Sequence, residues 1–110
     1  MSERLRKLND LLRDEVGRIL MVELENEIGT LTTVTGADIS PTLEHATIII
    51  SVYPIAKTSE VMEKIRKHIY AIQQALNKRL MMRPVPKIRF EIDQTEERAN
   101  QITDLLKKVN

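Results

Sequence analysis

The side chains best suited to chemistry in this sequence are positively charged and concentrated in one stretch. Residues 64 to 90 contain eight lysines and arginines and no aspartate or glutamate. Such side chains bind phosphate groups, so the stretch predicts a polyanionic partner, whereas a shorter run would fit a solvated helix face. The eight residues expected to hold phosphates are Lys64, Arg66, Lys67, Lys78, Arg79, Arg83, Lys87 and Arg89. Arg4, Arg6 and Lys7, near the N-terminus, are additional candidates.

Catalytic chemistry finds little support in the remaining residues. The chain has two histidines and no cysteine, and neither His45 nor His68 has a metal-ligating partner at a suitable spacing. The three glycines are isolated, so no glycine-rich phosphate loop is present. A hydrolase would require His45, Asp38 and Asp93 to converge in one pocket. We therefore expect a non-enzyme without a metal site, a cofactor or a small-molecule substrate.

Charge is segregated along the chain although the formal net charge is only +1. Seven acids and one lysine lie between residues 23 and 63, immediately before the basic stretch. The acidic segment of one copy could pair with the basic segment of another. A self-associating protein-interaction module, which binds no nucleic acid, therefore stays open as an alternative. We expect a monomer, and salt-sensitive self-association without RNA would favour that alternative.

Apolar periodicity predicts the elements that position these residues. Helices are indicated by apolar side chains at helical spacing, and strands by β-branched or alternating runs. The order α–β–β–α–β–α predicts an α+β domain whose helices pack on a three-stranded sheet. The expected elements are a helix over 3–22 capped by Ser2, a strand hairpin over 30–38 and 46–53, a helix over 59–82, a strand over 87–93, and a short helix beginning at Asp93 or Thr95.

The aromatic residues limit how nucleic acid is held. The chain has only Tyr53, Tyr70 and Phe90, and strand alternation turns Phe90 inward. A platform that stacks successive bases is therefore not expected, and contacts with the phosphate backbone fit better. We interpret Tyr70 as a helix-packing residue, with stacking on a base as the alternative. Membrane binding is not expected, because the apolar helix faces are used against the sheet.

Length and composition set the remaining limits. The 110 residues fit one domain over residues 1–110, and the 42% hydrophobic content fits a packed core. We expect no membrane span and no secretion signal, because no apolar run is long enough. The absence of cysteine favours a reducing compartment, and we predict a cytoplasmic protein.

Two segments carry a family resemblance, LTTVTGADISPTLEHATIIISVY over residues 31–53 and IQQALNKRLMMRPVPKIRFEID over residues 72–93. They resemble the ribosome-binding factor A family, and the likeness extends from Arg4 to Leu106. The resemblance implies a type II KH-like RNA-binding domain without the GxxG loop of other KH domains. It also implies a non-enzymatic factor that binds the free small ribosomal subunit and its rRNA. Such a factor assists late maturation, including rRNA processing, and is particularly important in the cold.

The chain departs from the family pattern in the middle of its long helix. The resemblance places a helix kink with the pattern Ala-x-Gly at His68, Ile69 and Tyr70, where this chain has no glycine. Sharp helix bends need an identifiable cause, and glycine is the simplest one. We therefore predict a gentler bend or a continuous helix at these positions.

Overall fold

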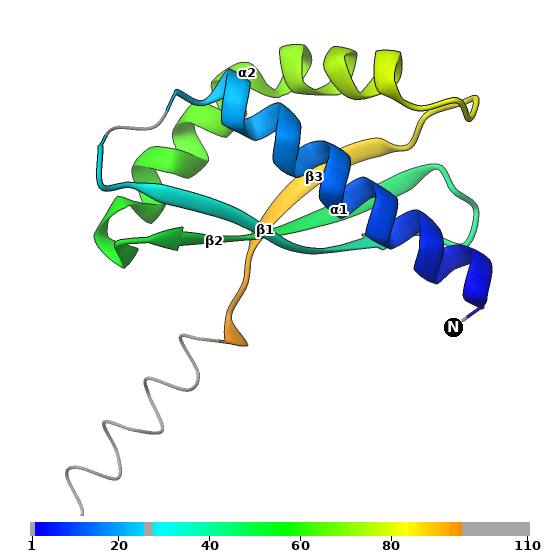
Figure 1. Ribbon diagram of the computed structural model, residues 1–110, viewed down its shortest axis with the longest axis horizontal. Coiled ribbons are helices and arrows are strands. Elements are labelled where there is room, and N and C mark those ends of the chain that lie inside the picture. Colours follow the sequence, from blue (N-terminus) through cyan, green and yellow to red (C-terminus); the bar gives the residue numbers. More distant parts are fainter. Residues whose placement is uncertain (1, 26–27, 96–110) are drawn as a thin grey trace, which may run out of the picture.

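Two α-helices cover one side of a three-stranded sheet in the computed structural model, which describes residues 2–25 and 28–95 (Figure 1). The predicted order is confirmed from the first helix to the third strand, and the α+β class with it. The expected final helix lies outside the described residues. In chain order the elements are α1 (Glu3–Glu23), β1 (Leu31–Ile39), β2 (His45–Tyr53), the 3₁₀ helix η1 (Ile55–Lys57), α2 (Thr58–Arg79) and β3 (Lys87–Ile92).

The sheet has the strand order β1-β2-β3, with β1 antiparallel and β3 parallel to the central strand. The antiparallel hairpin is as predicted, and α2 supplies the crossover that a parallel pair requires. The register places Lys87 opposite His45 and Arg89 opposite Thr47. These four side chains lie on the face of the sheet that α1 and α2 do not cover, because the opposite face holds the core.

The core lies between the helices and the inner face of the sheet. Strand alternation decides which residues of β2 enter it, since Ile48 and Ile50 are fully buried while His45 and Tyr53 are exposed. Each fully buried aliphatic side chain contributes about 1.5–3 kcal/mol through the hydrophobic effect. The helices add Leu12, Val16, Ile19 and Leu20 from α1 and Val61, Ile65, Ile72 and Leu76 from α2.

The long helix α2 is unbroken from Thr58 to Arg79 but is not straight, so of the two predicted alternatives a bend is found, and its being gentler than the family kink stays a prediction. Figure 1 shows that the helix axis changes direction near its middle, where the ribbon turns from green to lime. The helix ends at Arg79 rather than near Met82. The cause is Leu80, which is extended (φ −96°, ψ 140°) and buries its side chain in the core.

Two amide side chains attach the outer edges of the sheet to the helices. From α1, Asn9 Oδ1 accepts the backbone N–H of Ile39 at 2.8 Å. From α2, Gln73 Oε1 accepts the N–H of Ile88 at 2.9 Å, and Gln73 Nε2 donates to the carbonyl oxygen of Pro86 at 3.0 Å. The start of β3 is therefore held in place by one side chain of α2.

Candidate nucleic-acid interface

Three of the predicted phosphate-binding residues, Lys64, Lys67 and Lys78, form a line along α2 that we call the lysine stripe. At 100° per residue they fall within about 60° of one another, on the side of the helix away from its buried residues. Lys67 and Lys78 are exposed and Lys64 is half-buried. Within the described part of the chain, none of the three forms an ion pair. The stripe is not straight, because the axis of α2 changes direction near its middle (Figure 1). Its positive charge is only partly compensated, since Lys67 interacts electrostatically with the Glu63 carboxylate and helps to lower the pKa of that group.

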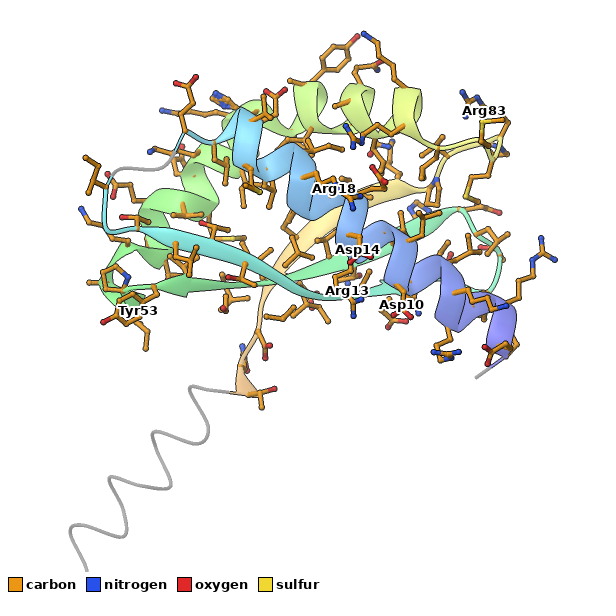
Figure 2. The ribbon with its side chains drawn as sticks, viewed as in Figure 1. Asp10, Arg13, Asp14, Arg18, Tyr53 and Arg83 are labelled. Carbon is orange, nitrogen blue, oxygen red and sulfur yellow. The ribbon has the colours of Figure 1, made fainter. Side chains whose placement is uncertain are left out.

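Two other predicted residues, Arg79 and Arg83, make contacts within the protein. Arg79 points toward α1, where it pairs with Glu15, whose side chain is only 17% exposed. Arg83 lies in the loop between α2 and β3 (Figure 2) and donates to the carbonyl oxygens of Leu80 at 2.6 Å and Met82 at 2.7 Å. Arg79 therefore holds the end of α2 against α1, and Arg83 stabilises the loop between α2 and β3.

Arg66 and Arg89 meet at a groove between the first half of α2 and the edge strand β3. Arg66 pairs with Glu63 at 2.5 Å, and this hydrogen bond lowers the pKa of the Glu63 carboxyl below its ordinary value. Arg89 pairs with Glu91 at 3.1 Å. Each guanidinium group at the groove thus has one carboxylate partner, which reduces its net charge. The apolar residues that line the groove are Met62, Ile65, Ile69, Ile88 and Phe90.

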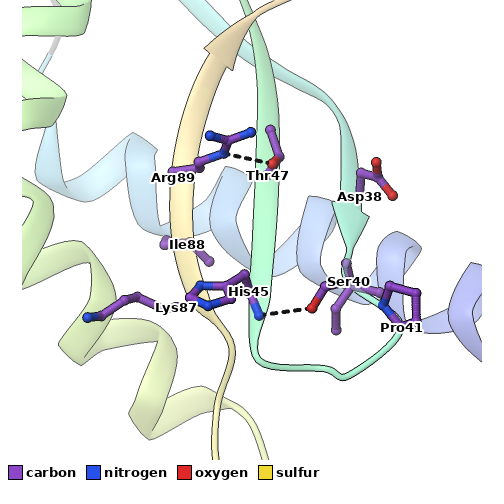
Figure 3. A pocket seen from close by; sticks show the side chains of 9 residues that line it. Asp38, Ser40, Pro41, His45, Thr47, Lys87, Ile88 and Arg89 are labelled. Atoms are coloured by element: carbon purple, nitrogen blue, oxygen red, sulfur yellow. Dashed lines mark hydrogen bonds between the residues drawn. The ribbon is translucent and has the colours of Figure 1, made fainter.

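A second hollow lies on the open face of the sheet, next to the turn between β1 and β2 (Figure 3). Arg89 reaches it as well, and its Nε donates to Thr47 Oγ1 at 3.1 Å. Lys87 is exposed at this hollow and has no ion pair among the described residues, whereas Asp38 lies on the opposite wall. The site can hold an anion near Lys87. Its lining residues are Asp38, Ile39, Ser40, Pro41, His45, Thr47, Lys87, Ile88 and Arg89.

The convergence that a hydrolase would require is not found. His45 and Asp38 line the hollow of Figure 3, but Asp93 lines a different one beyond the end of β3. The Asp93 N–H bonds to the carbonyl oxygen of Ile50, which is about 17 Å along β2 from His45. The Asp93 carboxylate accepts the backbone N–H of Thr95 at 2.9 Å, and this bond is the main reason that its pKa lies below the ordinary value. Asp93 is therefore a turn residue.

The outer surface of α1 is balanced in charge, unlike the lysine stripe. Arg6 pairs with Glu3 and, at 3.8 Å, with Asp10, and the hydrogen bond from Arg6 to Glu3 raises the pKa of Arg6. Arg4 and Lys7 are exposed and have no ion pair among the described residues. The three basic residues near the N-terminus are therefore not equivalent, since only Arg4 and Lys7 are available to an external anion. Figure 2 shows side chains of both signs along α1, labelled Asp10, Arg13, Asp14 and Arg18.

Tyr70 is a residue whose surroundings differ from our prediction. We expected it to pack against another helix, but it is 76% exposed and does not contact the core. The helical period already places it outside the apolar face of α2, beside Lys67, and this pattern is visible in the sequence. Of its neighbours at the predicted kink, His68 is exposed and Ile69 is half-buried in the groove.

Of the described acidic residues between 23 and 63, two are already paired with cations and a third lies on the open face of the sheet. Glu60 pairs with Lys57 at 3.4 Å, Glu63 pairs with Arg66, and Asp38 lies at the hollow on the open face. Among residues 2–25 and 28–95, no group of histidine, aspartate and glutamate side chains is placed to hold a metal ion. Neither of the described α-helices is long and apolar enough to cross a membrane.

Comparison with known proteins gives a consistent result. The family model of ribosome-binding factor A matches residues 4–106. Ribosome-binding factor A of Akkermansia muciniphila is 29% identical over 110 residues, which cover 100% of this chain and 87% of the relative. Ribosome-binding factor A of Halothermothrix orenii is 32% identical over 108 residues, covering 97% of this chain and 88% of the relative.

Solved structures share the fold. The crystal structure of ribosome-binding factor A from Thermus thermophilus gives a TM-score of 0.70 at 17% identity, covering 80% of this chain and 94% of that one. A homology model of the Thermus thermophilus factor, fitted into a cryo-EM map of a 30S–RbfA complex, gives a TM-score of 0.63 at 14% identity, covering 77% and 90%. At these identities the likeness establishes the fold alone.

Proposed function

The chain belongs to the ribosome-binding factor A family, and from this membership we propose that it binds the free small ribosomal subunit and assists its late maturation. The assistance includes processing of the small-subunit rRNA. The observation that carries the proposal is the family match over residues 4–106. Further support comes from the Thermus thermophilus factor, whose homology model was fitted into a map of its complex with the 30S subunit. The protein acts as a monomer in the cytoplasm, and its role is most needed in the cold.

The lysine stripe is the main RNA-binding surface in this proposal. Its three ammonium groups form no direct ion pair among the described residues, so they neutralise phosphates without breaking one, although Lys67 also interacts electrostatically with Glu63. Lys87 adds a contact on the open face of the sheet. Three to four phosphate contacts predict that log K falls with log salt concentration with a slope of about −2 to −3.

The remaining basic residues have smaller or indirect roles. Arg66 and Arg89 can contact RNA phosphates at the groove only if their ion pairs with Glu63 and Glu91 are weakened or broken. The loss of those ion pairs reduces the net binding free energy of each phosphate contact. Arg79 and Arg83 act indirectly, by holding the junction that carries Lys87. Arg4 and Lys7 provide a second contact region on α1, while Arg6 is engaged with Glu3.

Co-sedimentation with purified small and large ribosomal subunits, across a series of salt concentrations, tests this function. We expect the wild-type protein to sediment with small subunits alone and to be released as salt increases. Lys67→Glu/Lys78→Glu should abolish this retention at low salt, because it reverses two charges of the stripe. The control, Arg13→Gln/Arg18→Gln, removes two charges on α1 that are already paired with carboxylates, and it should bind as the wild type does.

Two results would count against the proposal. Equal, salt-sensitive binding to both subunits would indicate general attraction to polyanions. Absence of binding at low salt would favour a protein-interaction module. Processing is tested separately: cells whose only copy is Lys67→Glu/Lys78→Glu should accumulate precursor small-subunit rRNA, most strongly in the cold. Normal processing in those cells would separate rRNA maturation from the surface proposed here.

A further inference from the structure

Tyr70 is a large aromatic side chain that is exposed to solvent on the lysine-rich outer surface of α2. It is 76% exposed, and its hydroxyl has no hydrogen-bond partner among the described residues. An aromatic ring gains most by covering its faces, and this ring has no core contact to do so. The position is therefore poorly explained by the stability of the fold.

The neighbours of Tyr70 on α2 suit a nucleotide. Residues three and four positions away on a helix are adjacent at the surface, with Cβ atoms about 5–6 Å apart. Arg66 and Lys67 flank Tyr70 on its N-terminal side, and Gln74 follows it by one turn; all three are exposed. Two cations and a carboxamide therefore lie within about one helical turn of Tyr70, and one of the cations, Arg66, is paired with Glu63. Lys67 can bind a phosphate oxygen, and the Gln74 carboxamide can bind the polar edge of a base.

We propose that Tyr70 stacks on an unpaired base of the bound RNA, while Lys67 holds a phosphate beside that base. The ligand class is a single-stranded or bulged nucleotide, since a base inside a continuous duplex has both faces covered by its neighbours. This inference rests on the RNA binding proposed above. It adds a preference for unpaired nucleotides to a surface whose lysines contact only the backbone.

Oligonucleotide binding separates stacking from charge. Tyr70→Ala should bind a twelve-nucleotide oligouridylate about 5- to 30-fold more weakly, the lower part of the range for loss of a stacking aromatic. Tyr70→Phe keeps the ring and should bind as the wild type does. Alanine at this exposed helical site favours the helix, so the loss cannot be attributed to unfolding. Affinity for a twelve-base-pair RNA duplex should not change in Tyr70→Ala.

The salt dependence distinguishes the two kinds of contact within the same experiment. Tyr70→Ala should leave the slope of log K against log salt unchanged, because no phosphate contact is lost. Lys67→Glu should make the slope less negative by about 0.7, the value for one contact with single-stranded RNA. The matched control is Tyr53→Ala, since Tyr53 is also exposed, at 70%, but lies at the end of β2 and not on α2 (Figure 2).

Tyrosine fluorescence reports stacking directly, because the chain has two tyrosines and no tryptophan. In Tyr53→Phe, which retains Tyr70, the oligouridylate should quench the emission after correction for absorbance. In Tyr70→Phe, which retains Tyr53, it should not. An abasic ribose-phosphate chain of the same length should bind Tyr53→Phe without quenching.

The outcomes also separate failure of this inference from failure of the proposed function. Wild-type affinity in Tyr70→Ala, with the oligouridylate still bound, would overturn stacking and leave the RNA-binding function intact. Quenching of equal size in the two single-tyrosine proteins would overturn it as well. If the wild-type protein bound neither the oligouridylate nor small subunits, the function would fail and the stacking inference with it.

Discussion

Gln73 links α2 to the start of β3, and replacing it by methionine should destabilise the fold measurably. Methionine has a similar length but cannot accept the Ile88 N–H, and it cannot donate to the Pro86 carbonyl oxygen or to Asn77 Oδ1. All three bonds are partly buried, so water replaces them incompletely. At about 1 kcal/mol for each lost bond, the free energy of unfolding should fall by about 3 kcal/mol. For a domain of this size, this corresponds to a decrease in Tm of about 12–24 °C.

Urea unfolding followed by circular dichroism measures this change. The midpoint should fall for Gln73→Met while the slope m stays constant, since the surface exposed on unfolding is unchanged. The control is Gln74→Met, because Gln74 is adjacent in sequence but exposed on the outer side of α2, and its replacement should change stability by less than about 0.5 kcal/mol. Equal midpoints for the two variants would refute the role assigned to the Gln73 carboxamide. A weaker association of Gln73→Met with small subunits would further connect this bond to the placement of Lys87.

Three further predictions concern the cap, the core and a turn. Ser2→Ala removes the hydroxyl that accepts the Leu5 N–H at 3.2 Å and should cost about 1 kcal/mol in urea unfolding, whereas Ser2→Asp should restore stability. Ile48→Ala leaves a cavity at a fully buried site of the central strand and should cost about 2–5 kcal/mol; a cost below about 1 kcal/mol would mean that this part of the core collapses freely. The pKa of Asp93 is lowered in the folded state, so its contribution to stability is present above the ordinary carboxyl pKa and is lost as pH falls through the folded-state pKa. The stability difference between the wild type and Asp93→Asn should therefore shrink on acidification from about pH 6 to about pH 3, and a constant difference would contradict the lowered pKa.

Local patterns predicted the elements well because each one is determined over a short range. Helical spacing of apolar residues and a serine just before the helix identified α1, and the Ser2 hydroxyl indeed caps that helix. Alternation predicted which side chains of β3 turn inward, and Ile88 is buried while Lys87 and Arg89 are exposed. The end of α2 was predicted less accurately, because the decision depends on Leu80 entering a core built from other elements.

The candidate site was less predictable, because the charge of a side chain does not determine whether it points into solvent or toward another element. Arg79 and Lys78 are adjacent in sequence, yet Arg79 faces Glu15 on α1 and Lys78 faces water. The ion pair between Arg79 and Glu15 joins residues 64 positions apart, so no local sequence pattern predicts it. Tyr70 is the opposite case, since its position outside the apolar face was visible in the helical period. What the period could not show is that no other element covers it in the described part of the chain.

The amino-acid sequence by itself therefore determined the order of the elements, the class of the fold, the concentration of positive charge between residues 64 and 90, and the family. These properties follow from local spacing and residue type, which act within one helix turn or one strand. Only the tertiary structure decided which lysine and arginine side chains are available to a partner. Glu15 engages Arg79, and the loop carbonyl groups engage Arg83. It likewise decided that Tyr70 lies in water. The physical reason is that ion pairing and burial depend on which residues distant in sequence are brought together by the packing of α1, α2 and β3.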